Sequence, residues 1–335
     1  MDVSIVIINY KSAHHVINCI RSIYDETHDH GVEIIVVDNN SEDNSKQLIC
    51  DIFPQVVWVQ MKYNAGFARG NNAGIKVAVG KFILLLNGDT IILDRAIDKT
   101  TTWLQQRTEA IACGVQLLNE DGSYQISGAH FKTGGLNLLL PLPYFGDLVR
   151  WAGRRFKTKI PSIERVENEM EIDWIVGAFI MVRSDILRLG ELLDEDFFMY
   201  AEEIEWCSRL KQHGKLYLLS VPKVVHLGGG ASGDYYKTDE NQNSKNLWNK
   251  KGAQILVSQF LRIRKQYGIF WLLILTTFFL LEIPVFAAGL LVSRLAATKG
   301  KHNSSQLLGY IKNMRLVVTY LPKIIKNRPY FYKVY

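Results

Sequence analysis

Residues 3–41 read VSIVIINYKSAHHVINCIRSIYDETHDHGVEIIVVDNNS, and this stretch already predicts the class of fold. Residues 3–8 and 33–37 are continuous apolar runs rich in Val and Ile, as in strands that are covered on both faces. Between them, Val16, Ile17 and Ile20 recur at the three- and four-residue spacing of an amphipathic helix. This order predicts two parallel strands joined by a right-handed helical crossover.

The same alternation continues along the chain. Residues 56–60 and 81–86 are further strand-like runs, so strand and helix alternate four times within residues 3–90. Residues 174–183 (WIVGAFIMVR) predict one more buried strand, and residues 201–212 predict a helix. The sequence therefore predicts an α/β fold with a mainly parallel central sheet.

Polar residues collect where three of these strands end. They are Asn9-Tyr10, residues 38–40 (DNN) and residues 87–89 (NGD). Asp and Asn are ordinary turn formers, but three such groups at one expected edge favour a ligand site, because open α/β sheets bind ligands there. Ser41 is expected to cap the helix that follows.

The glycine-containing loop at residues 64–70 (NAGFARG) follows the third strand and lacks the GxGxxG pattern. No Walker A sequence is present either. Both facts argue against a dinucleotide site of the Rossmann type and against P-loop chemistry.

Asp89 and His226 are candidate metal ligands. A hard divalent cation on a diphosphate needs oxygen ligands and accepts an imidazole, above all when the ion is manganese. Phosphate oxygens and water would complete the shell. His226 by itself is equally typical of a structural histidine, but the glycines at 228–230 favour the close approach of a ligand.

Residues 194–205 are strongly acidic and include Phe and Tyr side chains. On a helix Glu202 and Glu205 share a face, while Glu203 points elsewhere. Carboxyl groups among aromatic rings can have a raised pKa and act as general bases. The alternative is an acidic first helical turn that the helix dipole stabilises.

Charge is distributed unevenly. Residues 237–335 hold 16 of the 39 Lys and Arg but only 3 of the 33 Asp and Glu. An acidic body with a basic tail indicates that the two regions have different partners. The four cysteines show no paired spacing and are typical of reduced thiols in a cytosolic protein.

Within the tail, residues 269–292 are apolar but interrupted by Glu282 and Pro284, so neither part is long enough to span a bilayer. Basic residues flank both ends, which favours both ends on the cytoplasmic side. We therefore expect a kinked re-entrant hairpin or an interfacial helix. Residues 307–320 suit a helix on anionic lipid, or a helix packed on the rest of the chain. No nucleic-acid recognition motif is present.

Taken together, seven segments resemble the family-2 glycosyltransferases of GT-A fold, in particular the bacterial rhamnosyltransferase-like branch. The segments are 3–10 (VSIVIINY), 36–41 (VVDNNS), 64–74 (NAGFARGNNAG), 84–90 (LLLNGDT), 174–183, 194–209 (DEDFFMYAEEIEWCSR) and 221–229 (VPKVVHLGG). Each is a weak motif, but seven in this order make a specific signal.

The resemblance implies roles for individual residues. Tyr10 and Asp38 would bind the nucleobase, and Asn64 would lie beside the nucleotide. Asp89 would be the metal-binding carboxylate on the nucleotide diphosphate, with His226 as the second metal ligand and Mn²⁺ or Mg²⁺ as the cofactor. Trp174 would line the sugar and acceptor pocket. Glu203 would be the catalytic base, and Glu202 would orient the donor sugar.

Two motifs depart from the branch. Residues 87–89 read NGD, where Asn-Pro-Asp or Asp-x-Asp is usual, which leaves one metal carboxylate. Residues 202–205 read EEIE, where Glu-Asp-x-Asp is usual, which lengthens the proposed base by one methylene. The resemblance still implies an inverting, metal-dependent hexosyltransferase.

The expected organisation is a GT-A catalytic domain over residues 1–236 and a basic, helical, membrane-associating region over 237–335. Residues 1–110 would bind the nucleotide, and residues 111–236, which include an irregular insertion, would bind the acceptor. The expected donor is dTDP-rhamnose or a UDP-sugar, and the expected acceptor is a lipid-linked or cell-surface saccharide.

We expect a peripheral or monotopic protein on the cytoplasmic face of the inner (plasma) membrane, in contact with anionic lipids. It would have no nucleic-acid partner, and oligomers are possible. Two alternatives stay open at this stage. One is a nucleotidyltransferase, which usually has a glycine-rich loop after its first strand, where this chain has Asn9-Tyr10-Lys11-Ser12. The other is a membrane-bound scaffold that binds nucleotide-sugars at a degenerate site.

Overall fold

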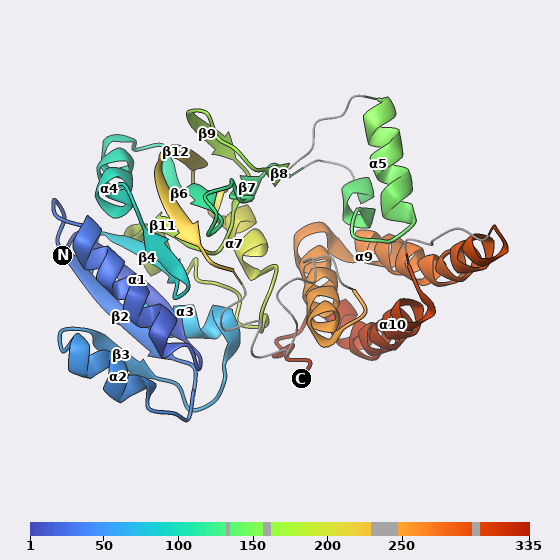
Figure 1. Ribbon diagram of the computed structural model, residues 1–335, viewed down its shortest axis with the longest axis horizontal. Coiled ribbons are helices and arrows are strands. Elements are labelled where there is room, and N and C mark those ends of the chain that lie inside the picture. The colour runs from blue at the N-terminus through green and yellow to red at the C-terminus, as the bar shows by residue number, and fades with distance from the viewer. Residues whose placement is uncertain (132–134, 157–161, 229–246, 297–301) are drawn as a thin grey trace. The chain divides into compact units, whose positions relative to one another are not determined.

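The computed structural model describes residues 1–131, 135–156, 162–228, 247–296 and 302–335 (Figure 1). The chain divides into two compact units. The first unit comprises Met1–Phe131, Pro161–Phe198 and Glu202–Lys237, and the second comprises Lys132–Ile160, Met199–Ala201 and Thr238–Tyr335. The expected boundary at 236/237 lies outside the described residues. The segment Lys132–Ile160, which we expected to belong to the acceptor half, groups with the second unit.

The described part of the first unit is built on a nine-stranded sheet. Its strand order is β3-β2-β1-β4-β11-β6-β12-β5, and β9 pairs with β12. The strands are β1 (Val3–Asn9), β2 (Val32–Asp38), β3 (Val57–Gln60), β4 (Phe82–Asn87), β5 (Thr90–Ile92), β6 (Ala110–Leu118), β9 (Glu169–Ile172), β11 (Phe179–Arg183) and β12 (Lys215–His226).

Six of these nine strands run in one direction. Strands β1 to β4 are parallel, and β6 and β12 share their direction because β11 is antiparallel to both β4 and β6. Strands β5 and β9 are antiparallel to β12. The prediction of a mainly parallel α/β sheet is confirmed.

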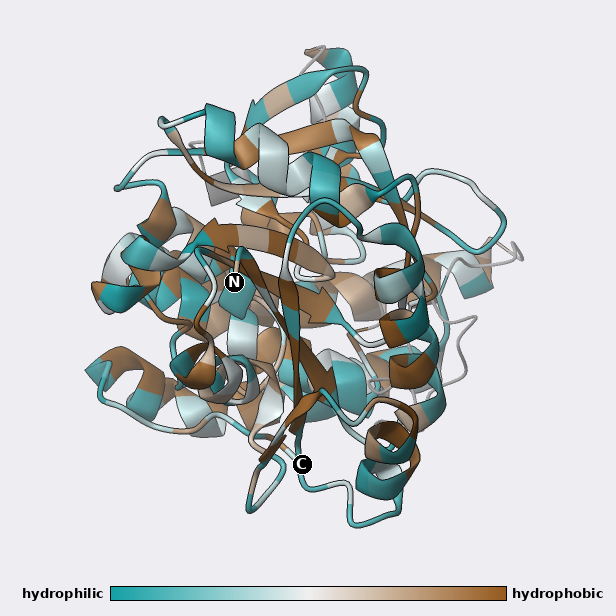
Figure 2. Ribbon diagram, turned by 90° about the vertical axis from the view of Figure 1, so that its left-hand side faces the viewer, coloured by the Kyte–Doolittle hydropathy of each residue, from teal (hydrophilic) through white to brown (hydrophobic). Residues whose placement is uncertain are grey.

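Helices cover both faces of this sheet. The helices of the first unit are α1 (Ala13–Glu26), α2 (Ser45–Ile52), α3 (Gly66–Val77), α4 (Ala96–Gln106), α6 (Ser184–Arg188) and α7 (Glu202–Leu210). On one face, the alternate β1 residues Val3, Ile5 and Ile7 pack in one buried cluster with residues of α1, α2 and α4. On the other face α3 lies so close that a Cβ on Gly74 would stand 2.4 Å from Val6 Cγ1. Figure 2 shows the resulting core as hydrophobic strands beneath helices with hydrophilic outer faces.

Residues 174–183 do not form one strand, so that prediction is wrong. The chain instead forms β10 (Trp174–Ile175) and β11, separated by Val176–Ala178. Strand β10 belongs to a small antiparallel sheet with β7 (Gly128–Ala129) and β8 (Ser162–Ile163). The run is apolar from Trp174 to Val182 because both sheets are largely buried here, and the break at Gly177 lets the chain pass from one sheet to the other.

The second unit is helical where it is described. Its elements are the 3₁₀ turn η1 (Gly135–Leu139) and the helices α5 (Phe145–Arg155), α9 (Lys250–Leu295) and α10 (Ser304–Lys326). Helix α9 has one non-helical residue, Gly268 (φ 86°), and it continues through Pro284. The break therefore lies before the apolar segment rather than inside it, and no hairpin forms within residues 269–292.

Candidate active site

The carboxyl ends of β1, β2 and β4 lie side by side. In register, Asn9 stands beside Asp38, and Ile8 stands beside Asn87. The three polar groups expected at one edge of the sheet are therefore brought together, as parallel pairing requires.

The Asp38 carboxylate is fully engaged at this edge. Its Oδ1 accepts from Asn9 Nδ2 (2.7 Å) and Ser41 Oγ (2.5 Å). Its Oδ2 accepts from the Ser41 amide (3.0 Å) and from Gln60 Nε2 (2.8 Å). Four bonds fill the acceptor capacity of a carboxylate. Asp38 therefore fixes neighbouring groups at the site instead of presenting a free oxygen.

Ser41 does not cap a helix, so that prediction is wrong. Helix α2 begins later, with Asn44 at its N-cap. The Ser41 hydroxyl instead accepts from Asn9 Nδ2 (3.1 Å) and from the Lys11 amide (2.9 Å), and it is buried. Tyr10, between these two residues, is half-buried at the end of β1.

The loop before α3 is tied to the same edge through Asn39. Asn39 Nδ2 donates to the Gly66 carbonyl (2.8 Å), and the Ala65 amide donates to Asn39 Oδ1. Asn64 is half-buried, and its Oδ1 accepts from the Gly66 amide (3.1 Å). At the start of α3, the Phe67 amide donates to the Phe198 carbonyl (2.8 Å), so this loop also holds the segment that precedes α7.

We expect Gly66→Ala to lower the free energy of unfolding by roughly 2–4 kcal/mol, because two costs combine. Gly66 has φ +73°, and a Cβ there would stand 2.0 Å from the Phe198 carbonyl oxygen. Gly122→Ala is the matched control, since Gly122 has φ +77° with no heavy atom within 4 Å of a Cβ. Urea unfolding of both variants measures the difference. Equal losses would contradict a role for the contact between Gly66 and Phe198.

Asp89 and His226 meet, as the sequence predicted. His226 Nε2 lies 3.5 Å from Asp89 Oδ1 and 3.2 Å from Asn87 Nδ2. Strand pairing explains the approach, because His226 at the end of β12 stands opposite Thr90 on β5. The Leu227 amide also donates to the Asp89 carbonyl (3.0 Å).

Gln125 fixes the state of the His226 ring. His226 Nδ1 lies 2.7 Å from Gln125 Oε1, an acceptor, so Nδ1 carries the proton. The lone pair is then on Nε2, which faces Asp89 and accepts from Asn87. His226 Nε2 and Asp89 Oδ1, two atom types that bind divalent cations, therefore stand 3.5 Å apart, which fits a shared cation. Within the described residues no group of three or more His, Cys, Asp or Glu could hold a metal.

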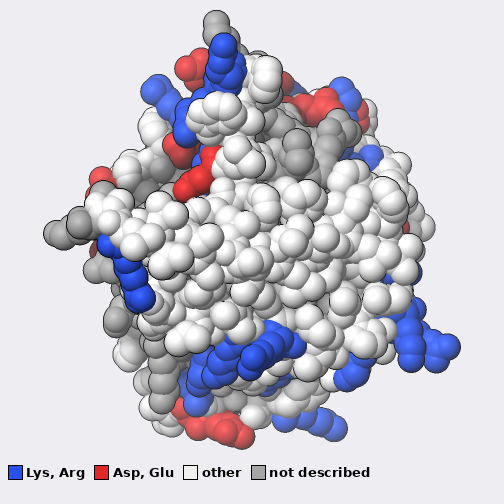
Figure 3. Space-filling view, turned by 90° about the vertical axis from the view of Figure 1, so that its right-hand side faces the viewer, with Lys and Arg blue, Asp and Glu red and all other residues white. Residues whose placement is uncertain are grey.

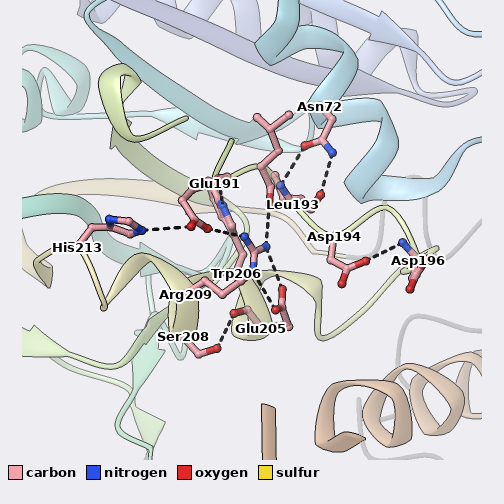
Figure 4. Close-up of polar contacts among 11 residues, drawn as sticks. Asn72, Glu191, Leu193, Asp194, Asp196, Glu205, Trp206, Ser208, Arg209 and His213 are labelled. Carbon is pink, nitrogen blue, oxygen red and sulfur yellow. Dashed lines mark hydrogen bonds and ion pairs between the residues drawn. The ribbon is translucent and has the colours of Figure 1, made fainter. Parts of the chain in front are cut away.

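The carboxylates of the acidic segment differ in their surroundings, and Figure 4 shows the contacts that Glu205 makes. Glu205 is structural, because Arg209 donates to both of its oxygens (2.9 and 3.0 Å). Arg209 also donates to Glu191 Oε2 (2.7 Å) and to the Leu192 carbonyl (2.7 Å). These bonds hold helix α7 against the chain that leads to it, and they leave Glu205 unavailable for chemistry.

Glu202 and Glu203 open α7 and differ in burial. Glu202 is 4% exposed, and its Oε2 has no hydrogen-bond partner among the described residues. Burial, followed by the neighbouring Glu203 charge, raises the pKa of Glu202 well above its usual value of 4.5. Glu203 is half-exposed. The chain enters this turn through Tyr200 (φ 72°) and Ala201 (φ 68°), a strained conformation of the kind found at functional sites.

We expect the stability of the wild type to fall relative to Glu202→Gln as pH rises. A raised pKa in the folded state means that the folded chain binds this proton more tightly than the unfolded chain. The stabilisation is complete below pH 4.5 and is lost as pH rises through the folded-state pKa. Urea midpoints of both proteins across this range measure the difference. A difference that does not change with pH would rule out a protonated Glu202.

Glu203 reaches the sheet edge through Gly177. A Cβ on Gly177 would stand 3.8 Å from Glu203 Cγ, and the adjacent Ala178 carbonyl accepts from the Asn87 amide (3.0 Å). Trp174 is half-buried on β10, which packs against α7. Helix α7 therefore borders the end of β4, where Asn87 contacts His226.

Three of the residues at this edge were missed by sequence reasoning. Ser41 was read as a helix cap. Gln60, the last residue of β3, could have been found, because it is a fourth polar residue at a strand end. Gln125 gave no signal, because it lies in a segment without regular periodicity.

This architecture defines the class of protein. A mainly parallel α/β sheet, extended by antiparallel strands and carrying Asp89 and His226 at its carboxyl edge, is the GT-A fold of nucleotide-diphospho-sugar transferases. Residues 4–165 match the family described as Glycosyl transferase family 2. This match covers just under half of the chain, and it assigns a family-2 glycosyltransferase domain to residues 4–165, as the resemblance implied.

Named relatives are distant. Over 222 residues the chain is 27% identical to a low-salt glycan biosynthesis hexosyltransferase of Haloferax volcanii, which covers 63% of this chain and 62% of the relative. It is 22% identical over 217 residues to a dTDP-rhamnosyl transferase of Shigella flexneri, which covers 64% of this chain and 66% of the relative. The chain thus spans less than two thirds of the length of these relatives.

Among solved structures, S. aureus TarS 1-349 is similar, with 14% identity and a TM-score of 0.47, over 96% of this chain and 92% of that chain.

Proposed function

We propose that the protein transfers a hexose from a nucleotide-diphosphate sugar to a saccharide hydroxyl, with inversion at the anomeric carbon. The observation that carries this proposal is the Asp89–His226 pair at the carboxyl edge of the sheet, with Glu203 on the neighbouring helix. The similarity to a dTDP-rhamnosyl transferase supports dTDP-rhamnose as the first donor to test, with UDP-hexoses next.

The nucleotide would bind over the ends of β1 and β2. We assign Tyr10 and Asn64 to this pocket because both are half-buried there. Asp38 would act by holding Asn9, Ser41 and Gln60 in place at the nucleotide end of the sheet. This assignment refines the direct contact between Asp38 and the base that the family resemblance implies.

Asp89 and His226 would hold Mn²⁺ or Mg²⁺ on the donor diphosphate. When bound, such an ion neutralises charge that develops on the leaving diphosphate. Gln125 holds the His226 ring in the tautomer that leaves Nε2 free to coordinate. In the structure, the side-chain amide of Asn87 donates to His226 Nε2 (3.2 Å) and so takes the place where the cation would bind.

Glu203 would serve as the base. Its carboxylate takes the proton from the acceptor hydroxyl as that oxygen bonds to the anomeric carbon, and the bond from this carbon to the phosphate oxygen breaks on the opposite side. One displacement inverts the configuration. Burial and the neighbouring Glu203 charge raise the pKa of Glu202, which favours a protonated Glu202 beside a charged Glu203. Protonated Glu202 can then donate to a hydroxyl of the donor sugar, while Trp174 lines the acceptor side.

The remaining assignments concern the acceptor and the location. We propose a catalytic domain over residues 1–236, with a nucleotide half at 1–110 and an acceptor half at 111–236, and a membrane-associating region at 237–335. Within the acceptor half, Lys132–Ile160 and Met199–Ala201 group with the second unit. Among the helices of the described residues, only α9 is long and apolar enough to cross a membrane. The acceptor would be a lipid-linked or cell-surface saccharide at the cytoplasmic face of the inner membrane.

Turnover of UDP-, dTDP- and GDP-sugars by the full chain, with and without Mn²⁺, tests this function. We expect one donor class to raise the melting temperature and to be consumed only when the cation and an acceptor are present. Stabilisation by a nucleotide-sugar without any turnover would favour a binding scaffold. Release of pyrophosphate from a nucleoside triphosphate and a sugar phosphate would favour a nucleotidyltransferase.

A further inference from the structure

Helix α9 carries an uncovered apolar stripe on its outer side. Phe270, Leu273, Leu281, Leu291 and Leu295 are between 48% and 78% exposed, and they recur at intervals that keep them on one side of the helix. The other side is buried, and Tyr310 of α10 donates to the Phe279 carbonyl (2.8 Å). Helix α9 is therefore covered on one side and open on the other, unlike a lone spanning helix, which lipid surrounds.

The only charged residue between positions 266 and 293 is Glu282, which is fully buried. Its two oxygens accept from the backbone amides of Tyr144 (2.6 Å) and Phe145 (3.1 Å). These amides begin α5 and would otherwise lack intrahelical partners. A carboxylate near a helix N-terminus is also favoured by the helix dipole. Glu282 thus caps α5 from a distant part of the chain and ties it to α9.

Helix α5 is amphipathic, and its exposed side carries interfacial residues. Leu148 is 56% exposed and Trp151 is 60% exposed, one helical turn apart, and Phe156 after the helix end is 78% exposed. Arg154 and Arg155 are exposed at the end of the same helix. The Phe145 ring packs edge-on against Phe278 of α9, so the exposed residues of α5 begin beside the apolar stripe. Trp with Arg at the end of an apolar face is typical of the boundary between lipid tails and headgroups.

The described residues of the second unit carry a positive net charge, which favours an anionic partner. They include fifteen Lys and Arg but only two acidic residues, Asp147 and Glu282. Asp147 is paired with Arg150 (2.6 Å), and Glu282 is buried. Figure 3 shows one side of the molecule, where a broad surface without charged side chains has Lys and Arg around much of its margin and some Asp and Glu mainly at the top and bottom.

We propose that the outer stripe of α9 and the exposed side of α5 form one docking surface for an anionic lipid bilayer, and that Glu282 holds α5 in that surface. The apolar residues would enter the acyl boundary while the flanking Lys and Arg contact phosphate headgroups. This surface specifies the membrane association of the proposed function, and it does not depend on the identity of the donor. It also explains why a carboxylate lies within an otherwise apolar helix.

Flotation of the full chain with vesicles tests the proposal. We expect binding to vesicles of equal parts phosphatidylglycerol and phosphatidylcholine, and much less to phosphatidylcholine alone. The paired changes Leu273→Glu with Leu281→Glu, and Leu148→Glu with Trp151→Glu, should each weaken binding by roughly tenfold or more. Leu189→Glu is the matched control, because Leu189 is 75% exposed in the first unit. It should bind as the wild type does.

Glu282→Gln tests the cap, because an amide has one acceptor oxygen for two backbone donors. We expect faster tryptic cleavage after Arg154 and Arg155, and weaker vesicle binding with the melting curve of the first unit preserved. Unchanged vesicle binding in both paired variants would overturn the docking surface. A wild-type dimer that Leu273→Glu dissociates would assign the face to a second copy instead. Vesicle binding without sugar transfer would refute the proposed function and leave the docking surface intact.

Discussion

Glu203→Gln should lower turnover by roughly 10²–10⁴-fold, because the amide cannot take a proton from the acceptor hydroxyl. Donor binding should change little, since the variant keeps the size of the side chain, and Glu203 is half-exposed beside Gly177. Steady-state transfer to a saccharide acceptor measures kcat, and a thermal shift with the donor alone measures binding. Loss of kcat with unchanged donor binding is the expected pattern.

The neighbouring carboxyl provides the comparison for this variant. Glu202→Gln makes the same chemical change one residue earlier, at a side chain that is 4% exposed. If Glu202 is protonated and donates to the sugar, its amide keeps a donor, and the loss of turnover should be much smaller than for Glu203→Gln. The reverse order of effects would exchange the two roles, and unchanged turnover in Glu203→Gln would refute the base assignment.

Asp89→Asn should lower turnover by roughly 10²–10³-fold, because it removes the single carboxylate at the expected cation site. The affinity for Mn²⁺ in the presence of nucleoside diphosphate should fall with it. Titration of Mn²⁺ by electron paramagnetic resonance measures that affinity without catalysis. Asp185→Asn is the matched control, because Asp185 is exposed in the first turn of α6, outside the site.

A variant at Gln125 distinguishes a cation site from a simple ion pair between Asp89 and His226. Gln125→Ala frees His226 Nδ1, so the ring can place its proton on Nε2 toward Asp89. We expect Mn²⁺ affinity to fall by about 10–100-fold, as for other residues that orient a metal ligand. If Mn²⁺ affinity is the same in the wild type, Asp89→Asn and Gln125→Ala, the pair does not hold the cation.

Where a local pattern of residues carries the information, the sequence predicted the structure correctly. The apolar runs of β1, β2 and β4 and the amphipathic period of α1 predicted both the elements and their order. The strand ends then placed Asn9, Asp38 and Asn87 at one edge, because parallel pairing leaves no other arrangement.

The sequence predicted the structure wrongly where tertiary contacts override the local preference of a residue. Ser41 is a good capping residue, but its hydroxyl bonds to Asp38 and Asn9 across two strands. Residues 174–182 are uniformly apolar because the chain is buried in two different sheets, so hydrophobicity could not reveal the break at Gly177. Glu282 looked like an interruption of an apolar segment, although it caps a helix whose first residues lie 138 and 137 positions earlier.

By itself, the sequence determined the α/β class, the order of strands and helices along the chain, the family, and which residue types stand at the strand ends. These features follow from the spacing of apolar and polar residues over a few positions, because that spacing repeats with the period of a helix or a strand. Only the tertiary structure decided that Asn87 and Gln125 surround His226, that Arg209 also holds Glu191, and that Glu282 caps α5. Such pairs join groups up to 139 residues apart, and their meeting depends on how the whole chain packs, which no local spacing records.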